Sequence, residues 1–186
     1  MKKAIVSLMI CGIAFVSVSG QTIPEKDAVM IDELINSTIT IKKVTIESEA
    51  LAKVFNGTFY KATPTYNHRG GIASCEEYGM VVYNEKVTEL EDVSETKTLD
   101  FLFSLLKKDL TIRNESEAKI FESALDAIYP VDWTVDAEDK KLLQQDGKWL
   151  FLRGSFFESK KGFVVTLDQN FRISRIDFDL EAVKGE

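Results

Sequence analysis

The spacing of apolar and polar residues divides the first half of the chain into short elements. Apolar residues at helical spacing predict a helix from about Glu25 to Asn36, and β-branched residues alternating with polar ones predict a strand over 38–46. A helical turn is expected over 47–55 and a strand over 57–63, where Pro64 removes a ladder donor. The segment 66–74 contains a Gly-Gly pair and is interpreted as a loop.

The middle of the chain passes from a strand pattern to a helical one. Residues 78–83 and 86–93 are predicted to form a β-hairpin around Asn84-Glu85. A helix is expected from about Thr98, with Asp100 in its first turn and an apolar face made by Leu99, Leu102, Phe103 and Leu106.

Two further helices are predicted after that one. Asn114 and Glu117 resemble a capping box at the start of the first, and Pro130 marks its end. The segment between the helices at 98 and 114 is short, so these two are expected to pack as a hairpin. A third short helix is expected over 136–145, ended by Gly147.

The last forty residues predict a three-stranded antiparallel meander. Residues 148–152 are apolar on both faces, which is typical of a central strand, and two polar turns separate them from strands near 163–167 and 171–180. The apolar positions of the final strand change parity at Ser174-Arg175, so one extra residue is expected there, as a β-bulge. The chain is therefore predicted to be an α+β protein with a mainly antiparallel sheet and a helix pair packed on one face.

The first twenty residues carry the pattern of a secretory signal peptide. Lys2 and Lys3 precede an apolar run of about thirteen residues, and small residues follow it. That run is too short to span a membrane, and no later segment is long and apolar enough to do so. Lipid attachment at Cys11 is the less favoured alternative, because Ile10 is branched where a small residue should stand. We expect export to the periplasm or the cell exterior, leaving a single domain over 21–186.

Charge and cysteine content narrow the classes of function. The formal net charge is −7, and removal of Lys2 and Lys3 leaves 21 basic against 30 acidic residues, so the exported form carries about −9. Such a protein repels nucleic acid, so no nucleic-acid partner is expected. Only Cys75 remains after cleavage, which excludes an intrachain disulfide.

Cys75 and His68 are the one thiol and the one imidazole of the exported chain, seven residues apart. An imidazole that activates a thiolate would make a nucleophile. However, Glu76 and Glu77 place negative charge beside the thiol, which opposes its ionisation. A buried or loop-edge cysteine is the favoured interpretation, and no catalytic residue is assigned.

Acidic residues near the end of the chain can be drawn as a metal site. Asp177, Asp179 and Glu181 alternate with apolar residues, on the same face as Arg175. A solvated sheet face explains this alternation, as a hairpin surface explains Glu89, Glu91 and Asp92, and no calcium-binding loop motif accompanies either group. No metal and no cofactor are predicted.

The C-terminal sheet is rich in aromatic residues. Such side chains either fill a core or line an apolar ligand pocket, and a filled core is favoured. The residues concerned are Trp149, Phe151, Phe156, Phe157 and Phe163.

Two segments carry a resemblance to known proteins. With its helix over 119–130 and its strand-containing segment 146–157, the chain resembles small secreted proteins of unknown function from Bacteroidetes-type gut bacteria. The resemblance implies source and compartment and transfers no catalytic residue. In topology, the helices followed by a meander are similar to cystatin-like and NTF2-like folds, which host binding modules and enzymes alike.

The sequence therefore favours a binding or interaction module of the cell envelope, whose partner is an envelope protein or a small apolar ligand. The alternative is an NTF2-like small-ligand carrier or enzyme with an aromatic-lined pocket. A pocket above roughly 300 Å³ between helices and sheet would favour that alternative.

Overall fold

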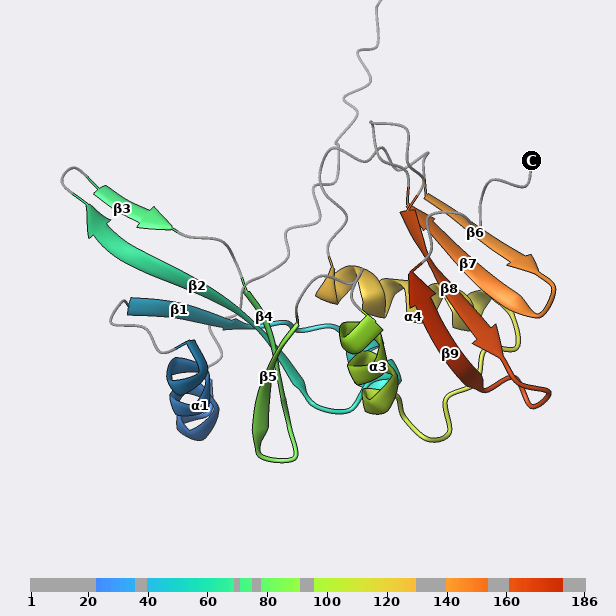
Figure 1. Cartoon of the computed structure of the whole chain (residues 1–186), viewed down its shortest axis with the longest axis horizontal. Coiled ribbons are helices and arrows are strands. Elements are labelled where there is room, and N and C mark those ends of the chain that lie inside the picture. The colour runs from blue at the N-terminus through green and yellow to red at the C-terminus, as the bar shows by residue number, and fades with distance from the viewer. Residues whose placement is uncertain are drawn as a thin grey trace, which may run out of the picture.

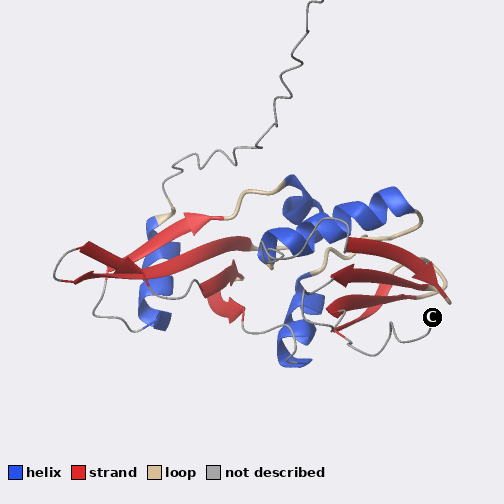
Figure 2. Cartoon of the chain, turned by 90° about the horizontal axis from the view of Figure 1, so that it is seen from above, coloured by secondary structure: helices blue, strands red, loops and turns tan. Residues whose placement is uncertain are grey.

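The structure is a computed structural model that describes residues 23–35, 40–68, 71–74, 78–90, 96–129, 140–153 and 161–178. Within these ranges the chain forms two antiparallel sheets and four helices, which is an α+β fold. Figure 1 shows one sheet at each end of the molecule, with α3 and α4 between them. Figure 2, turned by 90°, shows the same separation of the two sheets.

The first sheet is built from the N-terminal half of the chain. Its strands run in the order β1-β2-β4-β5, and β3 pairs with the far end of β2. The elements of this half are α1 (Glu25–Ile35), β1 (Thr40–Thr45), α2 (Glu49–Val54), β2 (Thr58–His68), β3 (Gly71–Ser74), β4 (Tyr78–Tyr83) and β5 (Lys86–Leu90).

The helix α1 covers one face of the first sheet. Its Ile31 is fully buried and packs with Tyr60, Ala62 and Met80 in a small cluster separate from the main core. Two strand predictions are confirmed here, since β1 lies within 38–46 and β4 and β5 form a hairpin around Asn84-Glu85. Both turn residues have positive φ, as a two-residue hairpin turn requires.

The second sheet is a four-stranded meander in the order β6-β7-β8-β9, so β7 is an inner strand, as its two apolar faces predicted. The predicted three-stranded meander is confirmed, with one more strand before it. The elements of this half are α3 (Thr96–Leu105), α4 (Glu115–Ile128), β6 (Lys140–Gln145), β7 (Lys148–Arg153), β8 (Lys161–Leu167) and β9 (Ile173–Phe178).

The predicted β-bulge in the last strand is confirmed. Thr166 pairs with Arg175 while Leu167 pairs with Ile173, so Ser174 is the extra residue. The Ser174 hydroxyl donates a 3.1 Å hydrogen bond to the carbonyl oxygen of Thr166. The bulge restores the parity of the strand, because Ile176 then faces the core with Val165.

The main hydrophobic core joins the two sheets through the helices between them. Phe55 and Phe59, from the first sheet and its approach, belong to the same buried cluster as Phe121 on α4 and Phe151 on β7. Their rings contact in series, with centroid distances of 5.8 Å for Phe55–Phe59, 6.1 Å for Phe55–Phe121 and 5.6 Å for Phe121–Phe151. Loss of one ring therefore affects the packing of both halves.

The predicted helix over 136–145 is wrong where the structure describes it. Residues 140–145 form β6, which pairs along its whole length with β7. Asp146 and Gly147 both have positive φ and form a tight two-residue hairpin turn. Gly147 therefore does not end a helix, as predicted, but belongs to the turn that brings β6 onto β7.

Two other expectations need correction. The predicted loop 66–74 is replaced by the end of β2 and by β3, and β2 runs on through Pro64. Pro64 is tolerated because β2 changes partner there, from β4 over 58–62 to β3 over 65–68. The helix predicted from Thr98 begins at Thr96, which places Asp100 beyond its first turn.

The start of α4 follows its sequence signature. The Asn114 side chain accepts a 3.0 Å hydrogen bond from the Glu117 backbone N–H, and the Glu117 carboxylate accepts a 2.7 Å bond from the Arg113 N–H. The helix ends at Ile128, and Pro130 lies outside the described residues. The predicted helix hairpin is not the main packing, since α4 lies chiefly against α2 and α3 lies chiefly against β9. Both helices contribute to the core beneath the second sheet.

Candidate functional site

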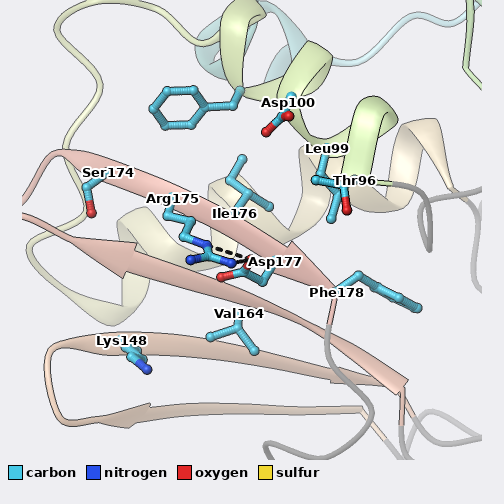
Figure 3. A pocket seen from close by; sticks show the side chains of 11 residues that line it. Thr96, Leu99, Asp100, Lys148, Val164, Ser174, Arg175, Ile176, Asp177 and Phe178 are labelled. Carbon is cyan, nitrogen blue, oxygen red and sulfur yellow. Dashed lines mark hydrogen bonds and ion pairs between the residues drawn. The ribbon is translucent and has the colours of Figure 1, made fainter.

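A groove of about 610 Å³ runs between α3 and the edge strand β9. Figure 3 shows Asp100 directed from α3 toward β9, with Ile176 directed back toward the helix. We call this feature the α3–β9 groove. Its lining residues come from α3 and from β7 to β9, and they are Thr96, Leu99, Asp100, Phe103, Lys148, Val164, Ser174, Arg175, Ile176, Asp177 and Phe178.

The groove follows the backbone edge of β9. Five consecutive residues, 174–178, line it. Side chains alternate between the two faces of a strand, so only a groove that runs along the edge meets every residue in turn. Within the described residues, β9 pairs with β8 alone, apart from a bridge between Arg172 and Thr111 ahead of the strand. Alternate N–H and C=O groups of an edge strand are available to a further strand.

One face of α3 forms the opposite wall. Thr96, Leu99, Asp100 and Phe103 follow the i, i+3, i+4, i+7 spacing of neighbours on one side of a helix. Phe103 is 39% exposed, so the apolar face predicted for this helix is not wholly buried, and Phe103 lines the groove. Leu99 is buried beneath it. This wall therefore presents one exposed aromatic ring and one carboxylate.

The polar part of the groove is an ion pair on β9. Arg175 donates to a single oxygen of Asp177 from both Nε and Nη2, each at 2.7 Å. The Arg175 side chain is 71% exposed, whereas that of Asp177 is 32% exposed. An exposed pair of this kind adds little to stability, and each partner can be exchanged for a ligand group at low cost.

Of the two nucleophile candidates, His68 and Cys75, the structure describes only His68, which is not among the residues that line this groove. His68 is the last residue of β2 in the first sheet, and its backbone pairs with Gly71. Cys75 lies outside the described residues, so a thiol–imidazole pair stays a sequence hypothesis.

Three aromatic residues of the second sheet occupy the core, whereas Phe178 lines the groove. Trp149, Phe151 and Phe163 are at most 4% exposed and belong to the main buried cluster. Phe156 and Phe157 lie outside the described residues. The predicted pocket aromatics that the structure describes therefore fill the core, and the rings that line the groove are Phe103 and Phe178.

Of the acidic residues considered as metal ligands, Asp177 and Glu89 lie in the described ranges. Asp177 pairs with Arg175, while Asp179, Glu181, Glu91 and Asp92 lie outside the described ranges. Over the described part of the chain, no three His, Cys, Asp or Glu side chains gather closely enough to hold a metal ion.

The one large pKa shift found among the described residues lies far from the groove. Burial raises the pKa of the Tyr60 phenol, and its 2.5 Å hydrogen bond to the Asp27 carboxylate raises it further. Tyr60 is under α1 on the first sheet, so this shift reflects structure rather than a reactive site.

Comparisons with known proteins complete the description. No family model matches the chain, and no curated protein and no solved structure matches it. None of the helices in the described ranges has the length and apolar character needed to cross a membrane. The α3–β9 groove is therefore the feature of the chain that bears most directly on its function.

Proposed function

We propose that this chain is an exported binding module of the cell envelope, and that the α3–β9 groove binds an extended segment of a partner protein. The partner segment adds to the free edge of β9 as a further strand. The observation that carries this proposal is the run of five consecutive β9 residues along the groove, opposite one face of a helix. Export is supported by the basic and apolar pattern of residues 1–20.

Strand addition suits this geometry because the backbone supplies affinity and the side chains supply selectivity. Five residues of an antiparallel strand cover about 17 Å, which accommodates a partner segment of similar length. Main-chain groups of β9 would pair with the segment, while Phe103 would contact an apolar side chain from it. Asp100 and the Arg175–Asp177 pair would select polar neighbours.

A small-ligand carrier is the second candidate, and the cavity volume favours it. About 610 Å³ lies within the usual range of roughly 300–1,000 Å³ for small-molecule sites, and it exceeds the threshold set for this alternative. The cavity nevertheless opens along a strand edge, and Trp149, Phe151 and Phe163, which were predicted as a carrier's pocket wall, are buried in the core. We therefore rank strand addition first.

Selection of peptides by the full chain tests the proposal. A random dodecapeptide display library identifies binders, whose dissociation constants are then measured by fluorescence polarisation. Phe103→Gln should weaken binding about tenfold, because it removes the apolar contact from the groove wall. Leu143→Gln is the matched control, since Leu143 is 42% exposed on β6, at the opposite edge of the same sheet.

The outcomes separate the two candidates. Selected peptides that lose affinity with Phe103→Gln and keep it with Leu143→Gln support strand addition. Failure to select any peptide, together with a small molecule retained in native mass spectra of the purified protein, would favour the carrier. Export is tested separately, by whether the mass of the protein in the periplasmic fraction corresponds to loss of about twenty N-terminal residues.

A further inference from the structure

The turn between β8 and β9 holds a phenylalanine in a backbone conformation that phenylalanine disfavours. Phe171 has φ of 62°, in the left-handed region. The other described residues with positive φ are glycine, asparagine, aspartate or glutamate, and all of those lie in turns or beside strands. A bulky aromatic residue gains nothing from this conformation and raises the energy of the turn.

The turn is held firmly in this shape. The Asp168 carboxylate accepts hydrogen bonds from the backbone N–H groups of Asn170, at 2.7 Å, and Arg172, at 2.9 Å. The Asp168 N–H donates to the Arg172 carbonyl at 2.8 Å, and the Phe171 N–H donates to the Asp168 carbonyl at 3.0 Å. The backbone conformation at Phe171 is therefore fixed, which sets the direction in which its side chain leaves the turn.

Packing does not account for the Phe171 ring. Its side chain is 47% exposed, and it is absent from the hydrophobic clusters found in the described residues. Glycine or asparagine would fit the left-handed position with less strain and would expose no ring to water. A left-handed backbone and an exposed ring thus coincide at Phe171, and neither stabilises the fold. This combination points to a role in binding.

Two arginines and one aspartate lie around the same concavity as the ring. A concavity of about 750 Å³ is lined by Phe171 together with Arg113, Arg172, Asn170 and Asp109. A 2.9 Å bond from the Ile112 N–H to the Phe171 carbonyl and the Thr111–Arg172 bridge lay residues 111–113 alongside 170–172. Neither arginine forms an ion pair with another described residue. On a chain of net charge −7, these two guanidinium groups outnumber the one carboxylate of the lining, Asp109, and with the exposed ring they form a local basic and aromatic surface.

We propose that this surface, formed by Arg113, Phe171 and Arg172, binds an acidic segment of a partner protein in which a carboxylate neighbours an apolar side chain. Guanidinium groups pair with carboxylates through two parallel hydrogen bonds, and the exposed Phe171 ring would contact the apolar side chain. Charge complementarity decides the occupant. An acidic segment is attracted to these two guanidinium groups and is repelled by the acidic remainder of the chain, so it binds at this surface rather than elsewhere. The surface stands independently of the α3–β9 groove, which can be empty while the turn is occupied.

The two sites are nevertheless connected. A smaller concavity of about 210 Å³ shares Phe103 with the groove and Arg172 with the turn. Lys107 and Lys108 also line it and add two further positive charges at this end. A single extended segment that enters at the turn can therefore continue along β9.

The test uses two labelled dodecapeptides that differ only in charge. One carries a Phe-Leu pair flanked by glutamates, and the other carries glutamines at the same positions. Each is titrated into the ¹⁵N-labelled full chain, and amide shifts report where it binds. We expect the glutamate peptide to shift residues 109–113 and 169–172 and to bind about tenfold more tightly than the glutamine peptide at low salt.

Variants separate a binding role of the ring from a folding role. Phe171→Gly and the double variant Arg113→Gln with Arg172→Gln should each weaken the glutamate peptide about tenfold. Leu143→Gln and Lys119→Gln remove an exposed apolar side chain and an exposed positive charge elsewhere, and should change affinity by less than about twofold. The melting temperatures of Phe171→Gly and Phe171→Asn should equal or exceed that of the parent chain.

Each opposite result has a distinct meaning. Equal affinity for the two peptides, or shifts that avoid the turn, would overturn the assignment of an acidic partner. Shifts confined to residues 96–103 and 174–178 would support the groove and contradict this inference. Melting temperatures lowered by more than about 4 °C in both Phe171 variants would show that the ring stabilises the fold.

Discussion

The face covered by α1 and the edge formed by β9 treat their polar groups in opposite ways. Under α1, Tyr60 donates to Asp27 at 2.5 Å, and Lys43 pairs with Asp32 at 2.6 Å. The polar groups of this face are satisfied by one another, and Tyr60 is only 1% exposed. They hold a helix against a sheet.

At the β9 edge, polar groups are left facing solvent. Arg113 and Arg172 have no ion-pair partner among the described residues, and a strained ring is exposed between them. One side of the β9 strand has no partner strand within the described ranges, and the helix beside it exposes Phe103. The comparison teaches that one end of the molecule uses polar groups for stability, whereas the other leaves them available. Substitutions should accordingly lower stability at the first end and binding at the second.

The largest effect is expected in the core that both ends share. Phe121→Ala removes a fully buried ring that contacts Phe55 and Phe151, and should lower the free energy of unfolding by about 3–5 kcal/mol. Urea unfolding followed by circular dichroism measures the change. In NMR spectra of the ¹⁵N-labelled chain, the amide signals of β2 and β8 should disappear at the same urea concentration. Separate midpoints for the two sheets would show that they unfold independently.

The next effect concerns the α1 face alone. Ile31→Ala empties a fully buried position between α1 and the first sheet and should cost about 2–4 kcal/mol. Because Ile31 belongs to the separate cluster, peptide affinity at the β9 edge should stay within about twofold of the parent value. Fluorescence polarisation at a temperature where the variant is folded checks this, and a large loss of affinity would undermine the division between the two regions.

A smaller effect is expected from the Tyr60–Asp27 hydrogen bond. Tyr60→Phe should cost about 1–3 kcal/mol at neutral pH, because the Asp27 carboxylate loses its donor. Burial and the Asp27 bond raise the pKa of Tyr60, so the native state keeps its proton where an unfolded tyrosine, with pKa near about 10, loses it. This contribution to stability is complete below about pH 10 and is lost as the pH rises further.

Urea midpoints between about pH 8 and pH 11 check that sign. The difference in stability between the parent chain and Tyr60→Phe should shrink as the medium becomes more alkaline. A difference that stays constant over this range would mean that the Tyr60 phenol titrates normally in the native state.

The smallest effect on stability is expected from the ion pair at the groove. Arg175→Gln should change the free energy of unfolding by no more than about 1 kcal/mol, since the Arg175 side chain is 71% exposed. Its effect on the affinity of selected peptides should be larger than its effect on stability. Calorimetry and polarisation on the same preparation give both values, and a strong destabilisation without loss of affinity would reverse the comparison.

Local signals in the sequence were sufficient for several elements. The Ser174 bulge follows from a change of parity within one strand, and the Asn114 cap follows from two residues three positions apart. The strand β6 was missed because Leu142 and Leu143 are adjacent and show no alternation. Its identity comes from pairing with β7 across the Asp146–Gly147 turn, so tertiary pairing overrides the local pattern.

Only part of each candidate site could be predicted from the sequence. A last strand in a meander lies at an edge, so the free side of β9 followed from the predicted topology. The partner wall did not, because α3 lies about seventy residues earlier and its packing on β9 depends on the shared core. The strain at Phe171 also has no sequence signature, since an aromatic residue after Asp-Gln-Asn suggests a turn but no left-handed backbone.

Hydrogen–deuterium exchange of the β9 backbone tests the central claim most directly. With a selected peptide at saturation, amides within 174–178 should exchange about tenfold more slowly, while those of α1 and of β2 beneath it should not change. Unaltered exchange along β9, or protection that appears at β6 or α1 instead, would contradict the assignment of this edge as the binding surface.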